Sequence, residues 1–146
     1  MTTKNLTSAY IKKNKRGSHL KLDISFPQIE KIQDKSYFLV IQSTSPKCSR
    51  VTIYPLKKKQ ILKLSITGTD ISETSIERLS DILKDYEIIH TSGLLIKKKE
   101  LNFECYLNLN FQDPKSKDLK LALNNLRNIF KLINIEEIGL KRNLTV

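Results

Sequence analysis

Residues 61–96, ILKLSITGTDISETSIERLSDILKDYEIIHTSGLLI, decide the fold. Apolar and polar side chains alternate over residues 61–66, which predicts a strand with one buried face. Turn residues follow, and residues 71–86 then carry apolar side chains at helical spacing, capped by Ser72 or by Thr74 with Glu77. Residues 87–96 predict a second strand, with a bulge or kink at Ser92-Gly93.

The rest of the chain continues this series of elements. Residues 97–100 form a charged connector of hairpin length, and residues 101–109 alternate more regularly than any other segment. Residues 118–132 have helical spacing, and residues 135–140 predict a last strand. The order strand, helix, strand, strand, helix, strand is that of the ferredoxin-like βαββαβ arrangement. We therefore expect an α+β protein whose four-stranded antiparallel sheet is covered on one face by two helices.

Residues 61–96, together with FECYLNLN at 103–110, resemble ACT domains, which are small regulatory modules that sense ligands. The resemblance spans residues 61–141 and implies a homodimer that binds an amino-acid effector near the start of the first helix. Here the residues at that place are Gly68, Thr69, Asp70, Ile71 and Ser72. The turn lacks the proline usual in the family, and Asp70 would repel a carboxylate at short range. Gly68 is alternatively a plain turn residue.

The chain is basic, and its charge is unevenly divided. It has 26 Lys and Arg against 15 Asp and Glu, a formal charge of +11, with 39% hydrophobic residues, as in folded proteins. Residues 1–60 hold 13 Lys and Arg against 3 Asp and Glu, which gives +10, whereas 13 and 12 in the remainder give +1. This asymmetry points to a polyanionic partner for the first part of the chain.

The first part divides into a basic arm (residues 1–18) and a β-rich module (residues 19–60) with strands expected at 20–26, 37–41 and 51–56. Phe26-Pro27-Gln28-Ile29 and Ile53-Tyr54-Pro55 are similar to the AbrB-like swapped-hairpin family of DNA-binding regulators. We expect nucleic acid to be bound by basic residues of the arm and of the last residues of the β-rich module. These are Lys12, Lys13, Lys15, Arg16, Lys57, Lys58 and Lys59. The other interpretation of the last three, Lys57, Lys58 and Lys59, is a solvated linker without a binding role.

The residues that carry most enzyme chemistry are scarce. The two histidines, His19 and His90, and the two cysteines, Cys48 and Cys105, provide neither a metal-ligand cluster nor a disulfide framework. We expect His90 to be a surface or satisfied residue and Cys105 to be a core residue. Glu136 and Glu137 would point to opposite faces of a strand. We therefore expect no catalytic residues, no metal and no cofactor, and hence no enzyme.

The sequence contains no apolar run long enough to cross a bilayer, and its opening residues lack the apolar centre of a signal peptide. We expect a cytoplasmic protein that does not bind membranes. The favoured function is non-enzymatic regulation, with an ACT-like dimerising and ligand-sensing domain and a basic module that binds nucleic acid. The alternative is an amino-acid-binding regulatory or assembly module of a metabolic enzyme, without nucleic acid.

Overall fold

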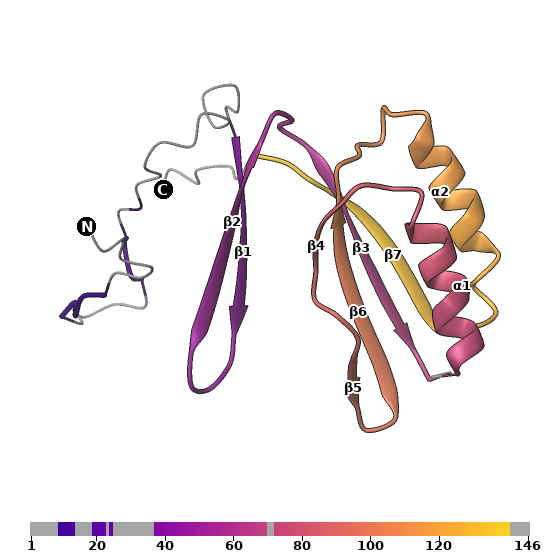
Figure 1. Ribbon diagram of the computed structural model, residues 1–146, viewed down its shortest axis with the longest axis horizontal. Helices are drawn as coiled ribbons and strands as arrows, with labels where there is room; N and C mark the ends of the chain where they lie inside the picture. The colour runs from indigo at the N-terminus through magenta and orange to yellow at the C-terminus, as the bar shows by residue number, and fades with distance from the viewer. Residues whose placement is uncertain (1–8, 14–18, 23, 25–36, 70–71, 141–146) are drawn as a thin grey trace, which may run out of the picture. The chain divides into compact units, whose positions relative to one another are not determined.

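The structure is a computed structural model that describes residues 9–13, 19–22, 24, 37–69 and 72–140 (Figure 1). Contacts divide the chain into two units, Met1–Glu30 and Lys31–Val146, and the described helices and strands all belong to the second. The predicted α+β class is confirmed, because that unit contains antiparallel sheets and two helices. The predicted domain boundaries at residues 18 and 60 stay predictions. The described helices include none long and apolar enough to cross a membrane.

A two-stranded hairpin precedes the main sheet. Strands β1 (Tyr37–Thr44) and β2 (Ser49–Leu56) pair antiparallel from Tyr37↔Leu56 to Thr44↔Ser49, which confirms the strands predicted here. The strand predicted at 20–26 is wrong over its described residues, since Leu20, Leu22 and Ile24 are exposed and lie outside any strand. Alternation alone does not hold a strand, because each strand needs a neighbour for its backbone hydrogen bonds. Residues 26–29 and 34–36 lie outside the described residues.

The main sheet has five strands in the order β4-β6-β3-β7, with β5 also paired to β6. All its pairings are antiparallel. Helices α1 (Glu73–Leu83) and α2 (Lys115–Asn124) follow β3 and β6 in the chain and lie against one face of the sheet (Figure 1). The strands, in chain order, are β3 (Ile61–Gly68), β4 (Ile88–Thr91), β5 (Leu95–Lys97), β6 (Glu100–Leu107) and β7 (Leu132–Ile138).

The core lies between the sheet and the helices. Alternate residues of β3 and β6 point into it, and the helices contribute their leucines, so that the period-2 and period-3.6 patterns meet on one interface. Each fully buried Leu or Ile stabilises the fold by about 1.5–3 kcal/mol relative to an exposed one. The buried core residues of these elements are Leu62, Leu64, Ile66, Leu79, Leu83, Leu101, Cys105, Leu107, Leu119 and Leu123.

The helices are shorter than the sequence predicts. Ser72 caps α1, because its Oγ accepts a hydrogen bond from the Ser75 N–H at 3.3 Å. The prediction that the second helix runs to residue 132 is wrong: α2 ends at Asn124, and tighter turns follow, with the Leu126 N–H donating to the Leu123 carbonyl. Two consecutive asparagines, weak helix formers, stand at this end. The turns bring Phe130 back into the core.

The predicted interruption between residues 87 and 96 is confirmed. Gly93 lies between β4 and β5 with a φ of 72°, a left-handed conformation that glycine adopts without steric penalty. Across the break, Ser92 stays attached to β6, since its Oγ accepts from the Glu104 N–H at 3.0 Å. After β5 the chain turns through only two residues, Lys98 and Lys99, before β6 begins.

Candidate functional site

The predicted ligand turn follows β3. Gly68 is buried at the end of that strand, Thr69 is exposed, and Asp70 and Ile71 lie outside the described residues. The hydroxyl of Ser72 is already used as the helix cap and lies 2.8 Å from the Ser75 Oγ. Whether this turn binds a ligand stays a prediction.

Gly68 has a packing role in this structure. A Cβ at this position would lie 2.8 Å from Cδ1 and 3.4 Å from Cα of Phe130. Phe130 is itself 2% exposed, so its ring has little free space into which it can move. The absence of a side chain at Gly68 is therefore explained by close contact with Phe130, without reference to a ligand.

The basic residues of the N-terminal arm are described only in part. Lys12 and Lys13 are exposed, and the Lys12 ammonium donates a hydrogen bond to the Lys21 carbonyl at 2.6 Å. Lys15 and Arg16 lie outside the described residues. The two described lysines are thus on the surface, where a polyanion would reach them.

The other predicted nucleic-acid residues link β2 to β3. Lys57 and Lys59 are exposed, whereas Lys58 is half-buried and donates to the Asn108 carbonyl at 3.3 Å. Within this linker, Lys58 therefore has a structural contact, and the two flanking lysines have their charges in solvent.

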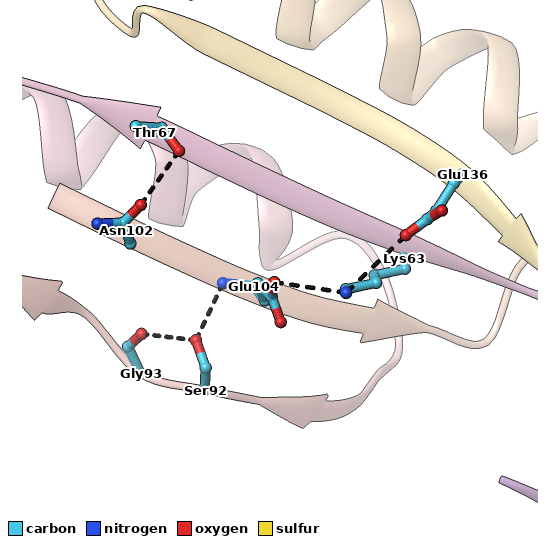
Figure 2. A network of polar contacts seen from close by, with 7 residues as sticks. All are labelled: Lys63, Thr67, Ser92, Gly93, Asn102, Glu104 and Glu136. Atoms are coloured by element: carbon cyan, nitrogen blue, oxygen red, sulfur yellow. Dashed lines mark hydrogen bonds and ion pairs between the residues drawn. The ribbon is translucent and has the colours of Figure 1, made fainter. Parts of the chain in front are cut away.

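A polar network that the sequence did not reveal crosses the sheet face turned away from the helices (Figure 2). The Lys63 ammonium lies 3.4 Å from a carboxylate oxygen of Glu104 and 3.9 Å from one of Glu136. It also lies 5.7 Å from the centre of the Tyr106 ring. Partial burial alone would lower the pKa of Lys63, but Tyr106, Glu104 and Glu136 outweigh it and raise that pKa above 10.5. Lys63 is therefore fixed as a cation in the middle of this face.

An aromatic cluster adjoins this network. The Tyr54 hydroxyl, from β2, lies 2.8 Å from Nδ1 of His90, from β4, and the two rings meet edge to face. His90 also packs edge to face on Tyr106, with ring centroids 6.1 Å apart. The expectation that His90 is a satisfied residue agrees with these contacts, which tie the hairpin to the sheet.

A cavity of about 680 Å³ lies between the hairpin and this sheet face. Its volume is in the range of small-molecule sites, and cationic, anionic and aromatic groups lie close together in its lining. The charged and aromatic lining residues are Arg50, Lys63, His90, Phe103, Glu104 and Tyr106. Gly68, Thr69 and Ser72 do not line it.

Three of the residues weighed for catalysis, Cys105, Glu136 and Glu137, have structural surroundings that account for them. Cys105 is fully buried, and burial raises the pKa of its thiol to about 12. Glu136 faces Lys63, whereas Glu137 accepts a hydrogen bond from the Phe111 N–H at 3.0 Å, so the two carboxylates do not form a pair. Among the described residues no three His, Cys, Asp or Glu side chains are grouped to hold a metal ion.

Comparison with known proteins identifies no family for this chain. The sequence matches no protein-family model, and no curated protein matches it significantly. One crystal structure is similar, that of a protein proposed to be a glycine cleavage system transcriptional repressor. The likeness covers 64% of this chain and 57% of that protein, with 9% identity and a TM-score of 0.42. A likeness at this level assigns neither fold family nor function.

Proposed function

We propose that this protein is a non-enzymatic regulator with two parts. Its basic N-terminal residues bind nucleic acid, and residues 61–141 form an ACT-like domain that pairs two copies and binds a small-molecule effector. The strand order β4-β6-β3-β7, with a helix after β3 and another after β6, supports a ferredoxin-like arrangement.

The observation that carries the nucleic-acid half is the charge division. Residues 1–60 hold a formal charge of +10, and the described lysines of that part include Lys12, Lys13, Lys57 and Lys59 with exposed side chains. Exposed lysines neutralise backbone phosphates and release their counterions, which provides affinity without sequence recognition. The expected binding is accordingly sensitive to salt and tolerant of sequence.

The test uses the full chain with an arm variant, Lys12→Gln, Lys13→Gln and Lys15→Gln. The matched control, here called the helix-side control, carries Lys115→Gln, Lys117→Gln and Lys131→Gln, which remove the same charge from exposed residues. Retention of labelled DNA and RNA on filters at about 50 mM salt is expected to fall in the arm variant and to persist in the control. Equal retention by both variants would contradict a role for the arm.

The cavity supports the effector half of the proposal. Arg50 and Lys63 match a carboxylate, and Glu104 matches an ammonium, so that the lining complements a free amino acid. An amino acid present at about 100 times its dissociation constant would stabilise the fold by about 2.7 kcal/mol. Thermal unfolding of the full chain against the twenty amino acids measures this, with Glu104→Gln as the variant that abolishes the shift. No shift with any amino acid would sink the effector half.

The pairing of two copies rests on the open edges of the sheet. In the strand order, β4 and β7 have a free side among the described strands, and unpaired edges favour association with a second chain. The mass of one chain is 16.9 kDa, and sedimentation equilibrium of the full chain is expected to give twice that mass. A mass of one chain at all concentrations would contradict the pairing.

A further inference from the structure

The turn between β5 and β6 has an unusual composition for its geometry. Lys97 pairs with Glu100 across the hairpin, and the two residues between them, Lys98 and Lys99, have φ values of 50° and 62°. A two-residue turn with both central residues left-handed favours Asn-Gly, because larger side chains are strained there. Lysine at both positions is thus not explained by the stability of the turn, and such strain is a marker of functional sites.

The charge of this turn is open to solvent. Lys97, Lys98 and Lys99, here called the lysine turn, are all exposed. The ion pairs of the described residues join Lys63 to Glu104 and Glu136 and Lys84 to Asp81, and include none of these three. Three adjacent cations therefore stand at the tip of a hairpin, where the nearest carboxylate in the register is that of Glu100, opposite Lys97.

A second basic turn stands near the same cavity. The turn between β1 and β2 contains Lys47, and Arg50 is the second residue of β2; both are exposed. Arg50 and Leu95, which precedes the lysine turn by two residues, both line the 680 Å³ cavity. Each hairpin therefore contributes a residue to the same hollow, and each carries basic residues at or beside its turn, where like charges add to one positive potential.

We propose that the lysine turn, with Lys47 and Arg50, is a second contact surface for the phosphate backbone of a nucleic acid. This inference rests on the proposed function and adds a contact within the folded domain to those of the arm and the linker. Arg50 offers a bidentate fork to a phosphate, and the lysines offer point charges that tolerate any sequence. Charges placed on two separate turns suit an extended polyanion better than a single small ion.

The neighbouring apolar side chains do not favour a membrane as the partner. Leu94, Leu95 and Ile96 are exposed, but Leu95 and Ile96 are consecutive residues of β5 and so point to opposite faces of that strand. Insertion into a lipid surface requires apolar side chains gathered on one face. The adjacent charges of the lysine turn, and not its apolar neighbours, therefore form the continuous surface that a partner would meet.

The test replaces the lysine turn in the full chain by Lys97→Gln, Lys98→Asn and Lys99→Gly. The last two changes supply the Asn-Gly pair that this turn geometry favours, so that the charge is lost without weakening the hairpin. The helix-side control again removes three exposed lysines. Fluorescence anisotropy with a labelled DNA duplex and a labelled RNA strand gives the dissociation constant between about 50 and 200 mM salt.

The expected result is a log–log salt slope that is flatter by about 3 in the lysine-turn variant and by less than about 1 in the control. Equal slopes in the two variants, with a wild-type chain that binds, would overturn this inference and leave the proposed function standing. A wild-type chain that binds neither nucleic acid would overturn both. Binding to phosphatidylserine vesicles that is lost in the lysine-turn variant, without nucleic-acid binding, would overturn the inference in favour of a membrane.

Discussion

The substitution Gly68→Ala separates a packing role for this glycine from a ligand role. The added Cβ would lie 2.8 Å from Cδ1 of Phe130, closer than a carbon normally approaches, and the 3.4 Å contact to Phe130 Cα involves backbone. Overpacking of this kind costs about 1–3 kcal/mol. Alanine recovers about 0.5–1 kcal/mol of the conformational entropy that glycine loses in a strand. Because an approach of 2.8 Å to a buried ring puts the cost in the upper half of that range, the free energy of unfolding is expected to fall by about 1–2.5 kcal/mol.

Urea unfolding followed by circular dichroism measures this change. The slope of the free energy of unfolding against urea concentration is expected to stay the same. The second arm of the experiment is Phe130→Leu, alone and combined with Gly68→Ala. Because the smaller side chain makes room for the new Cβ, the double variant should lose less free energy of unfolding than the sum of the two single losses. The difference, which is the coupling energy, is expected to be about 1 kcal/mol or more. A neutral Gly68→Ala, or strict additivity, would refute the packing explanation and favour a ligand role for the loop.

Four further predictions concern the described residues. Ellman's reagent is expected to titrate Cys48 in the native protein and Cys105 only after unfolding, since one is exposed and the other fully buried; two fast thiols would contradict this. Because burial raises the folded-state pKa of Cys105 from 9.0 to about 12, its stabilising effect is complete below pH 9.0 and is lost as the pH rises toward about 12. Cys105→Ala should remove that part of the alkaline decline in the free energy of unfolding, and an unchanged pH profile would argue against it. Lys98→Asn with Lys99→Gly is expected to raise the free energy of unfolding by about 1 kcal/mol, and a decrease would show that the turn is not strained. Tyr54→Phe, which removes the hydroxyl beside His90, should lower that free energy by about 0.5–1.5 kcal/mol in the same urea titration, and no loss would mean that this hydrogen bond does not hold the hairpin.

The parts of the fold that the sequence predicts are those set by local periodicity. Alternation over residues 61–66 and 101–109 identifies β3 and β6, and the break at Gly93 is visible as a glycine inside an apolar strand. The end of α2 is different, because apolar spacing continues past Asn124 while the backbone has already changed to tighter turns. That change accompanies the packing of Phe130 under Gly68, a contact between distant residues that no local pattern contains.

The candidate site is less predictable for the same reason. Lys63 and Glu104 stand on the polar sides of their strands in the sequence, but only the strand register makes them neighbours of Glu136. The left-handed backbone of Lys98 and Lys99 likewise follows from the two-residue turn and not from the residue types, which would favour another conformation. The predicted roles of Lys15, Arg16, Asp70 and Ile71 lie outside the described residues and stay predictions.

The salt dependence of nucleic-acid binding by the full chain tests the central claim most directly. If six of the basic groups meet phosphates of a DNA duplex, the logarithm of the binding constant should fall against the logarithm of the salt concentration with a slope of about −5. Anisotropy titrations between about 50 and 200 mM salt measure this slope. A slope near that value on several unrelated sequences would support a basic regulator that grips the phosphate backbone. The absence of binding at the lowest salt, or a slope near zero, would contradict it.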